Sequence, residues 1–232
     1  MNDTTVLLIG GGKHGANAGK YFKDQAARVI LVDNNPDCPA REFVSNGDFH
    51  ASDAKDAWEL ALRLKPDFIV PTCPGHTLGK WIGEHFHLRP LPDFLLRVLG
   101  RLPSRLVLGC DETKAVLVSS YMTSGETCSG SCIPYPARCT VTGEPRPAPL
   151  FRLLDYAIAG LFDCGKIFES EQMAAGVGAI RTSEFLAFVQ EIEARKPRTL
   201  AVGTACHCHG ILTLFETEQH VDMPPAVGLR AD

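Results

Sequence analysis

The sequence of 232 residues predicts an α/β fold with a doubly wound, mostly parallel sheet and one cysteine-rich loop insertion. Three observations predict it. Short apolar runs alternate with segments of helical period, which is the pattern of parallel strands and crossover helices. The first apolar run leads directly into closely spaced glycines. Between residues 123 and 149 the alternation disappears, and Gly, Pro, Ser and Cys dominate.

The first apolar run, Val6–Ile9, has the composition of a buried parallel strand. The glycines after it have the spacing G-x-G-x-x-G. This spacing permits a tight turn, close approach of the backbone to a pyrophosphate, and close packing of helix on strand. The helix expected over 16–27 would point its first N–H groups at the phosphates. The residues predicted to hold the pyrophosphate are Gly10, Gly12, Lys13, His14 and Gly15.

The second strand, Arg28–Asp33, ends in an acid 18 residues after Gly15. An acid at this position accepts hydrogen bonds from the adenosine ribose of a bound dinucleotide. Because Asp33 would repel a 2′-phosphate, NAD(H) is favoured over NADP(H). The alternative is a doubly wound fold that keeps the turn and binds another ligand, or none.

The other elements of residues 1–122 continue the alternation of strand and helix. A short third strand is expected near 43–50. The following helix begins at Ser52 or Asp53, either of which can cap it, and ends before Pro66. The elements after that are a strand over 67–73, a helix over 78–86 and a strand over 106–110.

Order resumes after the cysteine-rich loop of 123–149. Residues 150–232 are expected to continue the same sheet. The helix over 182–196 has Glu184 in its first turn and Arg195 in its last turn, which suits the helix dipole. The other elements expected here are a helix over 150–162, a strand over 166–170 and a strand over 198–205.

Nine cysteines are many for this length, and an odd number argues against a complete set of intramolecular disulfides. Metal binding or redox chemistry in a reducing compartment is the better explanation. Cys128, Cys132 and Cys139 have the spacing C-x₃-C-x₆-C, which suits three ligands of a [4Fe–4S] cluster better than a common zinc ribbon. Cys206 or Cys208 is the candidate to complete the site, with zinc as the alternative metal.

Several of these cysteines follow predicted strands. If all the strands are parallel, Cys73, Cys110 and the Cys206–Cys208 run meet at the edge that carries the glycines, where ligands bind in such folds. In an extended segment Cys206 and Cys208 point to opposite sides, so one of them joins a given site unless the chain turns at Gly210. Cys110 itself is expected in the core. The candidate catalytic residues at this edge are Cys73, His76, His207 and His209.

The first 75 residues, roughly, resemble the NAD(P)-binding Rossmann superfamily. Within it they are most similar to the TrkA-type nucleotide-binding domains and the dehydrogenase domain of siroheme synthase. The residues that carry the resemblance are Gly10, Gly12, Gly15, Asp33 and, for the TrkA-type domains, Asp53. The resemblance implies a Rossmann-like sheet in which the glycines bind pyrophosphate, Asp33 binds ribose and Asp53 lies near the adenine.

Composition excludes some partners. A net charge of −4 gives no electrostatic footprint for nucleic acid. No apolar run approaches the roughly 18 residues that span a membrane. The chain begins a strand almost at once, so no secretory signal is expected and a cytoplasmic location is predicted. A homo-oligomer is compatible with the sequence.

The leading hypothesis is an NAD(H)-dependent oxidoreductase with a cysteine-ligated metal centre near the nucleotide. An iron–sulfur cluster is favoured over zinc, and the partner is a small-molecule substrate or a redox protein. One alternative is a non-catalytic NAD(H)-binding module that senses redox state or metal. Another is a metal-handling, chelatase-like protein.

Overall fold

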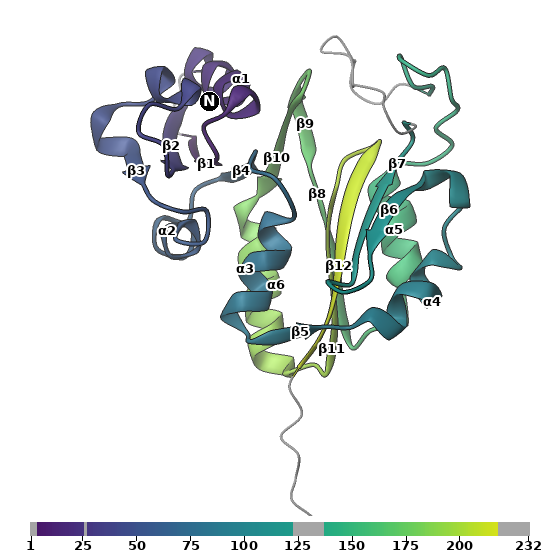
Figure 1. Cartoon of the computed structure of the whole chain (residues 1–232). Coiled ribbons are helices and arrows are strands. Elements are labelled where there is room, and N and C mark those ends of the chain that lie inside the picture. The colour runs from purple at the N-terminus through teal and green to yellow at the C-terminus, as the bar shows by residue number, and fades with distance from the viewer. Residues whose placement is uncertain (1–3, 26, 123–136, 218–232) are drawn as a thin grey trace, which may run out of the picture.

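The computed structural model describes residues 4–25, 27–122 and 137–217. Its strands form two sheets of six strands each, and both sheets mix parallel and antiparallel pairs. Helices pack on the faces of both sheets (Figure 1). The α/β class is therefore confirmed, whereas the single, mostly parallel sheet expected from the sequence is not what the chain forms.

Four parallel strands open the first sheet, joined by two of the helices. They are β1 (Thr5–Ile9), β2 (Arg28–Asp33), β3 (Phe49–Ala51) and β4 (Phe68–Pro71), with helices α1 (Lys13–Asp24) and α2 (Ala57–Leu64). Their order is β3-β2-β1-β4. Side chains of β1 alternate between two cores: Leu7 and Ile9 pack on the side of α2, and Val6 and Leu8 on the side of α1. Burial on both faces explains the continuous apolar runs.

An antiparallel hairpin extends this sheet beyond β4. Its strands are β9 (Glu171–Ala174) and β10 (Val177–Arg181). Strand β10 pairs with β4, and β9 forms the edge. Residues from the C-terminal half of the chain thus complete the sheet that the N-terminus began.

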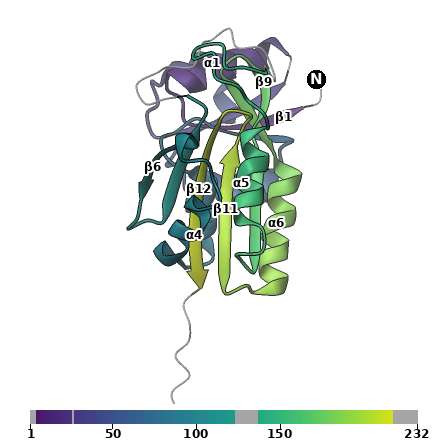
Figure 2. The same ribbon diagram turned by 90° about the vertical axis from the view of Figure 1, so that its right-hand side faces the viewer.

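The second sheet collects the remaining strands. They are β5 (Leu88–Pro90), β6 (Val107–Asp111), β7 (Val116–Ser120), β8 (Cys164–Glu169), β11 (Thr199–Ala205) and β12 (His209–Thr217). The main order is β6-β7-β12-β11-β8, and β5 pairs with β12. Only the β8–β11 pair is parallel among these described strands. Figure 2 shows β12 and β11 side by side.

Helices cover both faces of the second sheet. They are α3 (Thr77–His85), α4 (Leu95–Leu99), α5 (Leu150–Ile158) and α6 (Thr182–Arg195). Side chains of α3 and α6 share one core with Leu7 of the first sheet and Val202 of the second, so this layer joins the two sheets. Side chains of α4 and α5 pack on the opposite face, against Leu212 and Leu214 of β12. Short 3-10 helices occupy Pro39–Phe43, Asn46–Asp48, Pro92–Phe94 and Ser104–Leu106.

The departures from the sequence predictions concern strand pairing. The strand expected over 106–110 lies at an edge of the second sheet, antiparallel to β7, and Cys110 is exposed there rather than in the core. Residues after 150 contribute to both sheets instead of one. Strand β12 was not predicted, and the third strand is confined to Phe49–Ala51. Within the described ranges, no helix combines the length and apolar character that crossing a membrane requires.

Candidate functional site

The turn after β1 uses its three spaced glycines in three different ways. Gly10 has φ +95°, and a Cβ atom there would lie 2.8 Å from the backbone nitrogen of Cys73. A Cβ atom at Gly15 would lie 2.1 Å from the carbonyl oxygen of Gly10, so helix and turn touch here. At Gly12 a Cβ atom would meet nothing within 4 Å. The first and third glycines are therefore required by the fold, whereas the second faces open space.

That open space is a cavity of about 490 Å³ at the carboxyl ends of β1, β2 and β4, which we call the glycine-loop cavity. Six of the seven residues predicted to bind the dinucleotide line it: Gly10, Gly12, Lys13, His14, Asp33 and Asp53. Gly15 is buried behind the turn. The structure thus brings together residues that are up to 43 positions apart in the sequence, from Gly10 to Asp53.

The two carboxylates of this cavity are held by neighbouring groups. One Asp33 oxygen accepts the N–H of Gly11 at 2.5 Å, and the other accepts the N–H of Asn35 at 2.7 Å. The Asn34 side chain donates to Asp53 at 3.4 Å. Each carboxylate oxygen has a second lone pair, so Asp33 can still accept hydrogen bonds from a ligand.

The far end of the glycine-loop cavity is formed by Thr72, Cys73 and Pro74. The Thr72 hydroxyl donates to the carbonyl oxygen of Gly10 at 2.6 Å and fixes the turn. The Cys73 sulfur lies 3.1 Å from the Thr77 hydroxyl. Cys73 is the one cysteine of the expected sheet-edge group that lines this cavity, and sequence reasoning missed Thr72 because a lone threonine carries no motif.

His76, a candidate catalytic residue, is buried between the first turn of α3 and the second sheet. Its Nδ1 atom lies 2.8 Å from the Thr213 hydroxyl, and its Nε2 atom lies 3.2 Å from the Thr204 hydroxyl. Burial, with a contribution from Lys80, lowers the pKa of His76 to about 3. The imidazole is therefore neutral near pH 7 and joins α3 to β11 and β12.

The pKa of His76 has a consequence for stability. Below pH 6.5 the unfolded chain takes up a proton at this ring, whereas the folded chain does so only near pH 3. The stabilisation is thus complete above pH 6.5 and is lost as the pH falls, at most about 1.4 kcal/mol per pH unit. We expect urea unfolding to show about 1.6 kcal/mol less stability at pH 5 than at pH 6.5 from this residue.

His76→Gln removes the titration and keeps a polar group for the threonines, so its stability is expected to fall less over the same pH interval. His87→Gln, which changes an exposed histidine, is the matched control and should follow the wild type. Equal pH dependence of the wild type and His76→Gln would contradict the burial argument.

The turn between β11 and β12 forms the second candidate site, the Cys–His group of Cys206, Cys208 and His209. One ligand atom from each residue lies within 4.8 Å of the others. The Cys206 sulfur is 3.7 Å from the Cys208 sulfur and 3.8 Å from Nδ1 of His209. On the other side of the ring, Nε2 of His209 lies 3.2 Å from the sulfur of Met122. Both cysteines join one site because the chain reverses between Ala205 and His209, before Gly210, where the sequence had allowed a turn and which instead lies in β12 opposite Ala205.

The Cys206 sulfur is in an environment that favours the thiolate. It accepts the backbone N–H groups of Cys208 at 3.4 Å and His209 at 3.3 Å. Hydrogen bonds with the Cys208 thiol and with His209 hold the pKa of Cys206 far below its usual range, against the opposing effect of burial. The thiolate is the form that binds metals.

Cys139 has a similar environment. Burial raises its pKa, but hydrogen bonds from Thr142, from the Val141 backbone and from Arg146 outweigh burial and bring the value to about 7. Arg146 also acts electrostatically on His207, so Cys139 and the β11–β12 turn share a charged neighbour. Cys139 is not part of the Cys–His group. Cys128 and Cys132 lie outside the described residues.

His207 projects away from the Cys–His group. Its Nε2 atom lies 3.7 Å from a carboxylate oxygen of Glu169, and its ring packs edge-on against Phe151. Burial lowers the pKa of His207, although the nearby Cys206 thiolate opposes that shift. His207 is thus held at the edge of β8, while its neighbour His209 faces the two sulfurs.

The expected meeting of cysteines at one sheet edge is therefore only partly what the structure shows. Cys73 lines the glycine-loop cavity, and Cys110 is exposed at the far edge of the second sheet. Cys206 and Cys208 line a separate cavity of about 140 Å³, whose wall includes Gly178 of β10. Cys73 follows a strand of the first sheet, whereas Cys110 and the Cys206–Cys208 turn belong to the second, so the cysteines do not meet at one edge.

Comparison with known proteins adds a family. Residues 79–218 match the model of a family described as "Uncharacterized protein, C-terminal domain". The chain belongs to this family. The matched segment contains the whole second sheet, the β9–β10 hairpin and the Cys–His group. An uncharacterized protein of Archaeoglobus fulgidus is 28% identical over 221 residues, which cover 90% of this chain and 98% of that protein. The similarity to that protein thus extends beyond residues 79–218 into the part of the chain that forms the first sheet.

Proposed function

We propose that this protein is an NAD(H)-dependent oxidoreductase with a metal held by cysteine and histidine. The observation that carries the proposal is the position of the glycine-loop cavity. Strands β2 and β3 lie on one side of β1 and β4 lies on the other, so the cavity lies at the point where the strand order reverses. In open α/β sheets of the Rossmann kind, ligands bind in the crevice at this reversal.

The residues of the cavity fit a dinucleotide. Gly12 leaves open space beside the first turn of α1, where N–H groups attract phosphate. Asp33 and Asp53 lie on the β2 side, which suits the adenosine half, and Cys73 and Pro74 lie on the β4 side, which suits the nicotinamide half. Bound NAD(H) supplies hydride chemistry. The chain's own part is to orient the cofactor and to bind an acceptor, a small molecule or a redox partner protein.

The Cys–His group fits a single metal ion. In a tetrahedral zinc site with Zn–S bonds of about 2.3 Å, two sulfurs are about 3.8 Å apart. The Cys206 and Cys208 sulfurs are 3.7 Å apart, and His209 adds a nitrogen at 3.8 Å. Sulfurs this close suit one ion rather than two different irons of a cluster. The described donors therefore favour zinc, and a [4Fe–4S] cluster would depend on Cys128 and Cys132.

A specific contact also supports the alternative of an NAD(H)-binding sensor. Helix α1, which begins at the phosphate position, packs against β10. Strand β10 in turn contributes Val177 and Gly178 to the cavity beside the Cys–His group. A shift of α1 on nucleotide binding therefore has a direct mechanical route to the metal site. The third hypothesis, a metal-handling protein, predicts a metal that exchanges readily, whereas the enzyme and the sensor predict one that survives gel filtration.

Two measurements on protein purified without oxygen test these functions. The first is the affinity for NADH and NADPH. We expect NADH to bind at least about tenfold more tightly, because Asp33 repels the 2′-phosphate. Asp33→Asn should narrow that ratio. Asp37→Asn, an exposed acid of the same loop that does not line the cavity, should leave it unchanged.

The second measurement is NADH oxidation with ferricyanide as an artificial acceptor. Turnover that requires the metal supports the oxidoreductase. Binding without consumption favours the sensor, and equal affinity for NADH and NADPH in the wild type contradicts the role given to Asp33. Failure of both nucleotides to bind would reject the dinucleotide proposal.

A further inference from the structure

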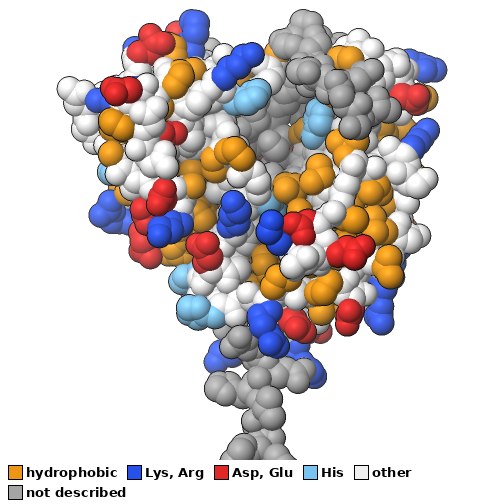
Figure 3. All heavy atoms as spheres, viewed as in Figure 1, with side chains coloured by type: hydrophobic (Ala, Val, Ile, Leu, Met, Phe, Trp, Pro, Cys, Tyr) orange, Lys and Arg blue, Asp and Glu red, His pale blue; other side chains and the backbone are white. Residues whose placement is uncertain are grey.

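A cavity larger than those of both sites above belongs to neither of them. It has a volume of about 770 Å³ and lies between α3 and the second sheet. We call it the α3 cavity. Figure 3 shows basic and acidic side chains beside hydrophobic ones on the face that α3 shares with β6. A volume of this size is typical of sites for small organic ligands.

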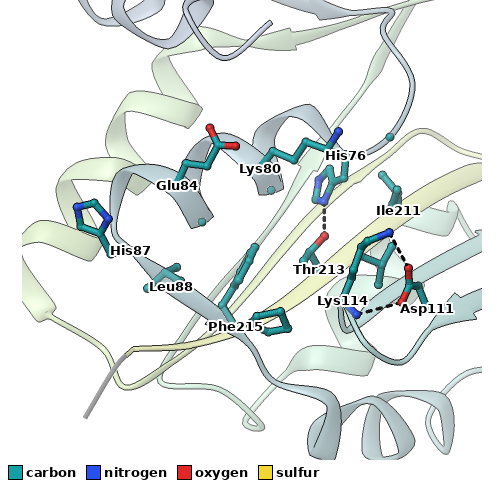
Figure 4. Close-up of a pocket in the computed structure, with 15 residues that line it drawn as sticks. His76, Lys80, Glu84, His87, Leu88, Asp111, Lys114, Ile211, Thr213 and Phe215 are labelled. Carbon is teal, nitrogen blue, oxygen red and sulfur yellow. Dashed lines mark hydrogen bonds and ion pairs between the residues drawn. The ribbon is translucent and has the colours of Figure 1, made fainter. Parts of the chain in front are cut away.

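The floor of the α3 cavity is apolar. Ile211, Thr213 and Phe215 alternate along β12 and face α3, whereas Leu212 and Leu214 between them point into the opposite core. Figure 4 shows Phe215 and Ile211 projecting toward the helix. Further apolar walls come from Leu88, Pro90 and Val116. A ligand here would bury hydrocarbon surface against β12.

Helix α3 approaches this floor through glycines. A Cβ atom at Gly79 would lie 2.4 Å from the His76 ring, and one at Gly83 would lie 2.9 Å from the Phe215 ring. The Gly83 contact sets how closely α3 approaches β12, and the missing Cβ atom of Gly79 leaves room for the His76 ring, which bonds to Thr213 of β12. The cavity is therefore bounded by packed, ordered elements, which is the usual character of a preformed ligand site.

The charged and titratable side chains that line the cavity differ in whether they already have a partner. Lys114 is paired with Asp111 at 3.1 Å, and His76 is neutral and bonded to two threonines. Lys80, one turn into α3, has no carboxylate within 4 Å among the described residues. Its position next to Gly75 puts an ammonium group at the end of the apolar floor (Figure 4). The cavity thus combines a hydrophobic surface with the Lys80 cation, while Glu84, four residues further along α3, has no cation within 4 Å in the part of the chain that the structure describes.

We propose that the α3 cavity binds an apolar carboxylate, with the hydrocarbon part on β12 and the carboxylate paired with Lys80. A smaller cavity lies between the α3 cavity and the glycine-loop cavity: it shares the lining residues Lys80 and Glu84 with the first and Cys73 and Pro74 with the second. This binding is independent of the nucleotide proposal.

The test uses three matched probes on the full chain without nucleotide: 2-naphthoate, neutral 2-naphthamide and cationic 2-naphthylmethylammonium. Calorimetric titration should show 2-naphthoate binding at least about tenfold more tightly than the amide. A partly desolvated ion pair with Lys80 is expected to contribute a free energy that corresponds to a ratio of this order. Lys80→Met should remove this preference while leaving amide binding unchanged. Lys114→Met should reduce it less, since Lys114 is already paired.

Two further variants locate the site. Ile211→Trp fills the cavity and should weaken all three probes, whereas Lys23→Met, on the remote helix α1, should weaken none. The tightest binding by the cationic probe would overturn the proposal in favour of Glu84 and Asp111. So would an unchanged preference in Lys80→Met, or no binding to folded wild-type protein. Gly12→Val should leave naphthoate binding intact, so failure of the nucleotide proposal and failure of this one are distinguishable.

Discussion

Replacing Gly12 with valine is expected to abolish NADH binding and leave the protein folded. A Cβ atom at this position meets nothing within 4 Å and the residue has φ −64°, so the chain tolerates a side chain here. The side chain would instead occupy the space where the pyrophosphate approaches the backbone. We expect affinity to fall at least about 100-fold, roughly 3 kcal/mol, measured by titration of NADH fluorescence.

Substitutions at two other glycines serve as controls for this experiment. Gly47→Ala also places a Cβ atom in open space, but away from the cavity, and should change neither affinity nor stability. Gly15→Ala would place a Cβ atom 2.1 Å from the carbonyl oxygen of Gly10 and should lower the melting temperature. If Gly12→Val retained NADH binding, the dinucleotide would have to bind elsewhere on the chain.

The glycine loop was predictable because its determinants are local. Gly10, Gly12 and Gly15 lie in one turn, and only helix α1 separates this turn from the strand that carries Asp33. Backbone sterics in a short segment depend on the sequence of that segment, so the spacing predicted the conformation. The same holds for α6, expected over 182–196 and found over Thr182–Arg195.

The division into two sheets was not predictable by the same means. A short apolar run predicts a strand, but it does not say which strand will pair with it, or in which direction. The run at 106–110 could continue a parallel sheet or, as the structure has it, pair antiparallel with Val116–Ser120. The prediction that the cysteines meet at one edge was wrong for this reason, because it assumed that all the strands are parallel and end at the same edge.

The α3 cavity shows a further limit of sequence reasoning. Its walls come from the segment around α3 and from strand β12, which are more than 120 residues apart. Neither segment carries a motif, and Gly83 becomes meaningful only once Phe215 is known to oppose it. A site made by packing of distant elements leaves no spacing to find.

Cys206→Ala is expected to remove the bound metal almost completely. The Cys206 sulfur is within 4 Å of both other members of the Cys–His group, and two backbone N–H groups hold it in the thiolate form. Loss of this sulfur leaves one sulfur and one nitrogen, too few for a closed thiolate site. Metal analysis should fall from about one equivalent to near zero, with NADH affinity unchanged.

The matched control is Cys110→Ala, which removes an exposed cysteine outside the group and should leave the metal content at the wild-type value. The variant Cys132→Ser then distinguishes a zinc site from an iron–sulfur cluster. A zinc ion held by Cys206, Cys208 and His209 should survive that change, whereas an iron–sulfur cluster that uses the 123–149 loop should lose iron and sulfide. Full metal content in Cys206→Ala would reject the Cys–His group as the metal site, because no other set in the described chain brings three such ligand atoms together.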